Sequence, residues 1–282
     1  MIGKEVLHMH SKVILITGAS SGIGKESAEY FHDKGYIVYG TSRKASKGVS
    51  TTGYGFYMIE MNVCNDNSVK TAIDSVYERE GRIDVIVNNA GIAISGSIED
   101  IGIEEIKINF ETNFYGAIRV CKEALRIMRP QHDGYIINIS SIAGKIAIPF
   151  DGCYSATKSA VEAVSESLSM EVKNFGIKVV IVEPGDIDTG MYSRSKSSAY
   201  ATGDSVYFKH FSHAMKATKK NESIGSKPIV IAELIERIIN NKKPSLRYVG
   251  GNFMDKIVIP LKNIMPSRCF ERLVMKRYDL CD

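Results

Sequence analysis

The chain has 282 residues, a hydrophobic content of 44%, a charged content of 24% and a formal net charge of +4. That composition is ordinary for a soluble globular protein, and the length is enough to bury a substantial core. So small a charge predicts no nucleic-acid partner, and no apolar run approaches the ~20 residues that a membrane-spanning helix needs.

The five cysteines are scattered and form no CxxC pair or metal-ligand spacing, so no metal site is predicted. Their odd number favours a reducing compartment. Cys153 is interpreted as a small loop-filling residue, because no histidine is evidently paired with it. Residues 1–12 contain no apolar stretch long enough for a signal peptide, and the expected location is the cytoplasm.

The first predicted strand, residues 12–16, is a short apolar run rich in β-branched residues, as in strands buried on both faces. The glycine-rich turn Thr17 to Gly24 (TGASSGIG) leads from it into a helix predicted over 25–34, with Gly35 as C-cap. Here backbone N–H groups and a helix N-terminus can hold a pyrophosphate; the alternative is a turn that needs glycine only for its shape. The candidate dinucleotide contacts are Gly18, Ser20, Ser21, Gly22, Ile23 and Gly24.

Basic residues follow the second predicted strand, residues 36–41. Ser42, Arg43 and Lys44 come at its end, with Lys47 close behind. A dinucleotide fold normally places an Asp or Glu near this offset, on the ribose 2′-hydroxyl, and that acid is missing. A guanidinium pairs with a 2′-phosphate in bidentate fashion. The pattern predicts NADP(H), with Ser42 and Arg43 as contacts; the alternative is a solvated basic loop.

Two further strands end in small polar residues. The strand over 56–61 is followed by Asn62 and Val63, where an adenine ring is expected. A helix over about 68–80 leads to the strand over 83–87, which the turn NNAG closes. This turn lines the cofactor cleft or stabilises the sheet edge. Its candidate contacts are Asn89, Ala90 and Gly91.

A helix predicted over about 103–129 contains Asn113 within an amphipathic pattern. Asparagine is mildly unfavourable inside a helix, so it often has a specific partner. The alternative is a satisfied polar residue in a helix interface.

A strand predicted over 135–139 delivers Ser140 and Ser141, and Tyr154 and Lys158 then lie four residues apart. On a helix this spacing places phenol and ammonium on one face, where the positive charge lowers the pKa of the tyrosine from its usual ~10. By itself the pair also fits a half-buried tyrosine beside a lysine that reaches solvent. An acid/base role depends on the rest of the chain supplying a redox cofactor.

A helix over about 155–174, capped by Gly176, leads to a buried strand over 177–182 and a rigid turn, Glu183 to Thr189. Pro184, Gly185, Ile187 and Thr189 of this turn are expected beside a nicotinamide. The alternation of strands and helices predicts a doubly wound parallel sheet, the three-layer α/β/α Rossmann fold. All these motifs fall at the carboxyl ends of strands, where such a sheet binds its ligand.

The remaining chain is expected to close the site. Residues 190–227 show no strand pattern and are predicted to form a lid over a substrate cleft. A helix over 228–240 and a last strand over 246–249 complete a core of about 12–252, in a single domain spanning 1–282. The extension 253–282 is broken by Pro260 and Pro266 and fits a cap on the pocket or a subunit contact better than a membrane-surface element.

Together these motifs resemble the short-chain dehydrogenase/reductase family, in its TGxxxGxG/YxxxK subgroup, over residues 12–190. Ser141 lies thirteen residues before Tyr154, the family's usual spacing for its catalytic serine, which favours it over Ser140. Asn62 stands where many members have Asp. The lid and tail are most similar to members that act on steroids, retinoids or other lipophilic alcohols.

The resemblance implies an NADP(H)-dependent oxidoreductase that interconverts a secondary alcohol and a ketone, on a lipophilic substrate such as a hydroxysteroid. Tyr154 would transfer the proton, Lys158 would stabilise the phenolate and hold the nicotinamide ribose, and Ser141 would position the substrate oxygen. Asn113 would anchor a water-linked proton path. Alternatives are a polar sugar or acyl-thioester substrate, or a non-catalytic NADP-binding regulator, although the complete Ser, Tyr and Lys set argues against the last. Members are often dimers or tetramers, so a homodimer or homotetramer is expected.

Overall fold

The computed structural model describes residues 11–46 and 48–281 of the chain. The predicted absence of a signal peptide in residues 1–12 falls almost wholly outside the described residues, and so does Lys47 of the basic cluster. All five cysteines are described, and they are free thiols.

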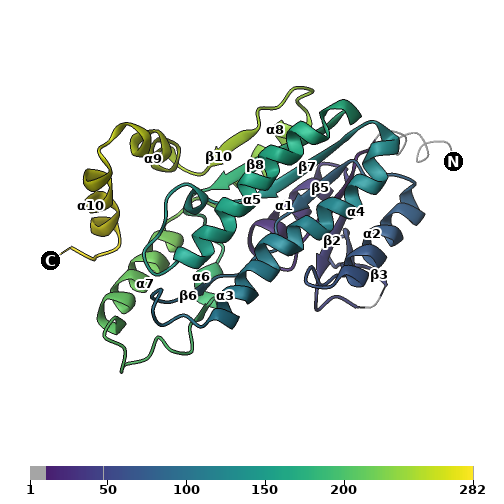
Figure 1. Ribbon diagram of the computed structural model, residues 1–282. Coiled ribbons are helices and arrows are strands. Elements are labelled where there is room, and N and C mark those ends of the chain that lie inside the picture. The colour runs from purple at the N-terminus through teal and green to yellow at the C-terminus, as the bar shows by residue number, and fades with distance from the viewer. Residues whose placement is uncertain (1–10, 47, 282) are drawn as a thin grey trace.

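The centre of the protein is an eight-stranded sheet of order β10-β8-β7-β5-β1-β2-β4-β3 (Figure 1). Neighbouring strands are parallel except at one edge, where β3 pairs antiparallel with β4. The strand order reverses between β1 and β5, and this switch point is where a doubly wound sheet binds ligands. The strands are β1 (Val13–Ile16), β2 (Ile37–Ser42), β3 (Val49–Thr51), β4 (Tyr57–Glu60), β5 (Val85–Asn88), β7 (Gly134–Ile139), β8 (Ile177–Pro184) and β10 (Arg247–Gly250).

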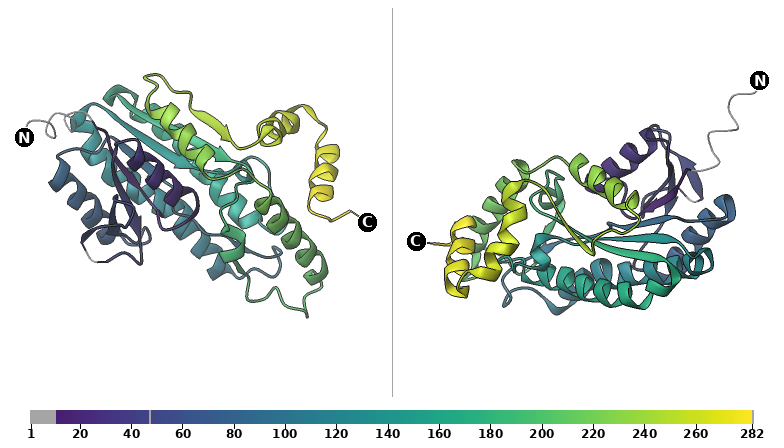
Figure 2. Two further views of the ribbon diagram at one scale, coloured as in Figure 1. Left: turned by 180° about the vertical axis from the view of Figure 1, so that it is seen from behind. Right: turned by 90° about the horizontal axis from the view of Figure 1, so that it is seen from above.

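Helices cover both faces of the sheet, so the predicted three-layer Rossmann fold is confirmed (Figure 2). One face carries α1 (Gly22–Asp33) and α8 (Ile229–Ile239). The other carries α2 (Asp66–Glu80), α4 (Gly116–Gln131) and α5 (Gly152–Glu171).

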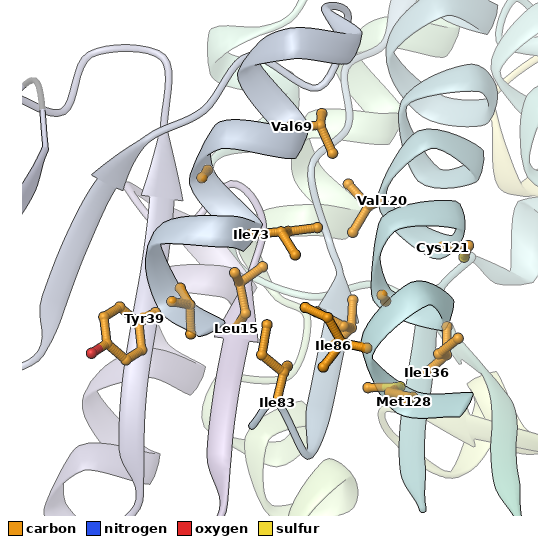
Figure 3. Packing of buried hydrophobic residues seen from close by; sticks show 14 of the residues in the cluster. Leu15, Tyr39, Val69, Ile73, Ile83, Ile86, Val120, Cys121, Met128 and Ile136 are labelled. Atoms are coloured by element: carbon orange, nitrogen blue, oxygen red, sulfur yellow. The ribbon is translucent and has the colours of Figure 1, made fainter. Parts of the chain in front are cut away.

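Successive residues of each strand point to opposite faces of the sheet and pack into two separate hydrophobic cores. Leu15, Ile86 and Ile136 pack against α2 and α4 (Figure 3), whereas Ile14 and Val87 pack against the opposite helices. Because both faces of each central strand are covered, the strands are apolar throughout and do not alternate with polar residues.

The helix predicted over 103–129 is interrupted. It consists of α3 (Ile103–Phe110), a π-helical turn η1 (Glu111–Tyr115) and α4. Asn113 lies inside the π turn, and π turns within helices are frequent at functional sites. The start of the next helix also differs from the prediction. The helix was predicted to begin at about residue 155, whereas α5 begins at Gly152 and therefore includes Tyr154.

The lid and the C-terminal extension are mainly helical. Residues 190–227 contain α6 (Met191–Arg194), the short strand β9 (Lys196–Ser197), which pairs with β6 (Ile94–Ser95), and α7 (Phe208–Ser223). The extension forms α9 (Phe253–Ile264) and α10 (Ser267–Arg277). Single turns of 3-10 helix, η2 (Ile142–Gly144) and η3 (Lys173–Phe175), flank α5.

The prediction that Pro260 breaks the extension was wrong, because Pro260 lies within α9. The helix begins at a capping box formed by Asn252 and Asp255, and a proline inside it removes only one backbone hydrogen bond donor. Pro266 does separate α9 from α10. Within 11–46 and 48–281, the helices include none that combines the length and apolar character needed to cross a bilayer.

Candidate active site

The glycine-rich turn after β1 is fastened to the turn after β5, across the switch point of the sheet. Thr17 Oγ1 accepts hydrogen bonds from the backbone N–H groups of Asn89 and Ala90, both at 2.9 Å. Asn89 Nδ2 donates to the Thr17 carbonyl at 2.9 Å. The NNAG turn therefore does both things that the sequence left open: it stabilises this edge of the sheet and lines the cleft.

Glycine is required at two positions of this turn. A Cβ atom on Gly24 would lie 2.4 Å from Asn89 Nδ2 and 2.6 Å from the Gly18 carbonyl oxygen, so no larger residue fits. Gly18 has φ +69°, a conformation that other residues rarely adopt. The shape of the turn thus brings backbone N–H groups to the N-terminus of α1.

A cavity of about 500 Å³ lies over this turn. Most of the predicted cofactor contacts line it, from the ends of β1, β2, β4 and β5 and from the loop after β8. They are Gly18, Ser20, Ser21, Gly22, Ile23, Ser42, Arg43, Asn62, Val63, Asn89, Ala90, Gly91 and Thr189. Gly24 lies behind the turn, where it permits the close packing described above.

Sequence reasoning missed several lining residues. Arg194 belongs to the lid, and its guanidinium donates to the Thr189 carbonyl at 3.0 Å. No motif in the sequence marks it, because its position depends on the short helix α6 that follows Thr189. Also missed were Thr41, Met61, Cys64, Ile92, Thr112 and Met191.

The charges of this cavity fit a phosphorylated dinucleotide. Its lining contains Arg43, Lys44 and Arg194, whereas no Asp or Glu is among the described residues that line it. A carboxylate would repel a 2′-phosphate, and guanidinium groups pair with phosphate oxygens. The residues present therefore fit NADP(H).

The remaining candidates lie around a second, smaller cavity of about 140 Å³, which adjoins the first through Ile23, Asn89 and Thr189. They come from β7, α5 and the loop after β8. They are Ser141, Tyr154, Lys158, Pro184, Gly185 and Ile187.

Tyr154 and Lys158 share one face of α5, as their spacing predicts. Both are buried, with 7% and 5% of their surfaces exposed, and Lys158 Nζ lies 5.7 Å from the centre of the Tyr154 ring. The ammonium donates to the Ile139 carbonyl at 2.9 Å. The lysine therefore points into the site and does not reach solvent, which excludes the alternative interpretation.

The expected lowering of the tyrosine pKa is wrong for the protein chain by itself. Burial raises the pKa of Tyr154, the charge of Asp151 raises it further, and a hydrogen bond with Ser141 opposes them. Burial lowers the pKa of Lys158 to about 8, against the opposing charge of Glu162. For both groups desolvation is the largest cause of the shift. The phenol is thereby kept protonated and ready to donate.

The two serines are distinguished by their partners. Ser140 Oγ donates to the buried Glu162 carboxylate at 2.7 Å, and is thereby committed to the core. Both serines line the same cavity as Tyr154, but Ser141 Oγ accepts from the Ala143 N–H at 3.1 Å and donates to the Pro184 carbonyl at a longer 3.4 Å, so it has no carboxylate partner among the described residues. The structure favours Ser141, in agreement with the spacing.

Asn113 is 2% exposed, and its amide has three partners. The oxygen accepts from the Ile92 N–H at 2.8 Å, and the nitrogen donates to the Ile92 carbonyl at 2.9 Å and to Thr157 Oγ1 at 3.1 Å. Asn113 therefore holds the turn after β5 against α5, beside Gly91 and Lys158. Its π-helical backbone turns the amide towards these partners.

A family model, described as short chain dehydrogenase, matches residues 12–199. A 3-ketodihydrosphingosine reductase of Bacteroides thetaiotaomicron is 38% identical over 263 residues, covering 93% of this chain and 96% of that protein. The chain belongs to the short-chain dehydrogenase family.

Two further comparisons concern the cofactor of this short-chain dehydrogenase. An NADPH-dependent 3-dehydrocapnine reductase of Ornithobacterium rhinotracheale is 32% identical over 273 residues, covering 93% of this chain and 95% of that protein. A solved structure of ElxO with NADP bound is 26% identical, with a TM-score of 0.69, covering 85% of this chain and 96% of that one. With the charges of the large cavity, they confirm the prediction of an NADP(H)-dependent oxidoreductase acting on CH–OH groups.

The surroundings of Cys153 disfavour a nucleophilic role. Burial raises the pKa of its thiol, and the charge of Asp151 adds to this effect. A raised pKa leaves little thiolate at neutral pH. The structure thus supports the interpretation of Cys153 as a filling residue.

The pKa of Lys158 predicts how activity depends on pH. The ammonium is charged below about pH 8 and is lost as the pH rises through that value. Because kcat/KM for NADPH reports ionisations of the free enzyme, we expect it to fall above about pH 8, by roughly tenfold per pH unit. Initial rates between pH 6 and 9.5 measure this. In Lys158→Met the overall rate should fall and the inflection should disappear; an unchanged inflection would assign it to another group.

Proposed function

We propose that this short-chain dehydrogenase reduces the ketone of a long-chain amino ketone, such as 3-ketodihydrosphingosine, to the secondary alcohol with NADPH. The catalytic cavity carries the proposal: a buried, protonated Tyr154 faces it beside Ser141 and next to the dinucleotide cavity. The names of the two reductases similar to this chain support the substrate class.

The proposed roles combine the positions of the side chains with those that the family resemblance implies. NADPH, when bound, supplies the hydride. Tyr154 donates its proton to the substrate oxygen, and Ser141 hydrogen-bonds the same oxygen to position it. Lys158 stabilises the resulting phenolate and holds the nicotinamide ribose. Asn113 holds the turn at Ile92 in place and anchors a water-linked path that returns the proton.

Two carboxylates of the catalytic cavity, Asp186 and Glu222, are candidate partners for the amine of an amino ketone. Lys158 and Arg277 line the same cavity, and Arg277 is paired with Asp186. A carboxylate attracts an ammonium group, so we place recognition of the amine at these two side chains.

A substrate panel tests the proposal. The decrease of NADPH absorbance is followed with 3-ketodihydrosphingosine, a 3-ketosteroid, retinal and an acetoacetyl thioester at equal concentrations. We expect kcat/KM for the amino ketone to exceed the others by at least tenfold, with the 3-hydroxy base as the product by mass spectrometry. A preference for the steroid would instead favour a hydroxysteroid dehydrogenase.

The N-acetylated ketone is the matched control for the amine. It keeps the carbonyl and the chain but carries no positive charge. We expect its kcat/KM to be about tenfold lower, the value of a charge-assisted contact of roughly 1.5 kcal/mol. Equal turnover of the two ketones would show that the carboxylates do not recognise the amine.

A cytoplasmic location and a homodimer or homotetramer complete the proposal. The free thiols support the reducing compartment, and the oligomeric state rests on the family resemblance. Size-exclusion chromatography with light scattering measures the mass in solution, for which a monomer of 31.1 kDa is the contradicting result.

A further inference from the structure

A third cavity, of about 370 Å³, lies under the C-terminal extension. Its floor is the segment after β7, and its other walls are the facing sides of α9 and α10. The apolar lining consists of Ile142, Ile146, Ile148, Met254, Ile257, Val258, Leu261, Phe270, Leu273 and Val274. The volume lies within the range usual for small-molecule sites.

This cavity adjoins the catalytic cavity. Ile142, Ile148, Arg277 and Tyr278 line both and form the wall that the two cavities share. An apolar group attached to a carbonyl at Tyr154 would enter the third cavity across this wall, beside Ile142 and Tyr278. The adjoining walls are supplied by α10 and by the loop that contains η2, so the substrate side of the site depends on the extension.

The helices that form the roof have apolar faces that the protein covers only in part. Figures 1 and 2 show α9 and α10 standing outside the three layers, near α7. Among their residues only Asp255 and Phe270 are buried. Amphipathic helices are stabilised chiefly by covering the apolar face. A ligand in the cavity would complete that cover.

The extension is fastened at the catalytic end of the cavity. Asp255 accepts hydrogen bonds from the backbone N–H groups of Asn252, at 2.9 Å, and Asp186, at 3.4 Å. Arg277 forms an ion pair with Asp186, and Tyr278 is buried against α7. These contacts hold the roof next to the loop of Pro184 and Gly185, and they fix the position of the wall that the two cavities share.

We propose that the third cavity binds the aliphatic chain of the substrate, while the carbonyl lies at Tyr154. The proposal rests on the proposed function, because it takes the substrate to be a ketone with a long unbranched chain. Burying one methylene contributes about 0.8 kcal/mol in transfer, which is roughly fourfold in affinity. We expect kcat/KM to rise by up to about fourfold per methylene and to level off once the cavity is filled.

A blocking variant tests the site by kinetics. Val274→Phe places a larger side chain in the cavity, and Ile264→Phe is the matched control, since Ile264 is 79% exposed on α9 and lies outside the cavity. We expect Val274→Phe to lower kcat/KM for the long-chain ketone at least tenfold and to leave a short-chain amino ketone and NADPH binding unchanged. Equal losses on both ketones, or no loss on the long one, would overturn the proposal.

A binding measurement separates this proposal from the proposed function. The chain contains no tryptophan, so Phe270→Trp gives a single fluorescent reporter in the cavity wall, and Ile264→Trp gives a control outside it. Dodecan-1-ol, which has the chain but no amino ketone, should change the emission of the first variant only. If dodecan-1-ol changes this emission but the enzyme does not reduce amino ketones, only the proposed function is refuted. If the enzyme reduces amino ketones but dodecan-1-ol leaves the emission unchanged, only the proposal for the third cavity is refuted.

Discussion

Replacing Tyr154 by phenylalanine is expected to lower kcat for ketone reduction by about 10³-fold, within the range that positioned acid catalysis contributes. The substitution removes only the phenolic oxygen from a buried ring, so the packing of α5 is kept. The loss should appear equally in kcat and kcat/KM, because the proton transfer occurs only in the transition state. Initial rates of NADPH oxidation with saturating ketone measure it.

Two controls distinguish a chemical from a structural effect in this variant. The dissociation constant of NADPH, from its fluorescence on binding, should stay within about twofold of the parent value. Tyr192→Phe makes the same change at a second, partly buried tyrosine of the catalytic cavity and should lower kcat far less. If Tyr192→Phe lowered kcat by about 10³-fold and Tyr154→Phe lowered it far less, Tyr192 would be the proton donor.

Replacing Arg43 by aspartate is expected to change the preference of the enzyme from NADPH towards NADH, by about 100-fold in the ratio of the two kcat/KM values. Arg43 is exposed at the end of β2 and lines the dinucleotide cavity, so its charge is available to a 2′-phosphate. Losing such a contact costs roughly 1.5–3 kcal/mol, and an introduced carboxylate also repels the phosphate. Parallel kinetics with both cofactors give the ratio.

Arg194→Ala is the matched control, because it removes a guanidinium from the same cavity at the opposite end, beside Thr189. It should raise the KM for NADPH and NADH by similar factors and leave their ratio unchanged. A ratio that shifted in Arg194→Ala and stayed constant in Arg43→Asp would place the 2′-phosphate at the lid and not at β2.

The sequence predicted most accurately those features that depend on neighbouring residues. Apolar runs such as residues 12–16 identified strands buried on both faces, because such runs are short, rich in β-branched residues and bounded by turn residues. Gly18 and Gly22 identified the cofactor turn, because only glycine adopts its backbone conformation freely. The four-residue spacing of Tyr154 and Lys158 placed them on one face because the period of a helix is fixed.

Three features of the site were not predicted, and two of them depend on contacts between distant segments. The pKa of Tyr154 depends on how completely other elements bury it, and burial raises it together with the charge of Asp151. The amide of Asn113, inside the π turn, finds its partners at Ile92 and Thr157. Arg194 reaches the cofactor cavity through a local turn, in which its guanidinium donates to the Thr189 carbonyl five residues earlier.

The sequence by itself determined the fold, the cofactor and the candidate acid/base pair, because each is encoded by residue types at short, fixed spacings. Only the tertiary structure decided how deeply Tyr154 and Lys158 are buried, that Asn113 lies in a π turn, and that the C-terminal extension walls an apolar cavity next to the site. Those properties come from burial and from contacts between residues far apart in the chain, such as Asp186 with Arg277. Desolvation and packing therefore determine the properties of this site that its sequence motif does not specify.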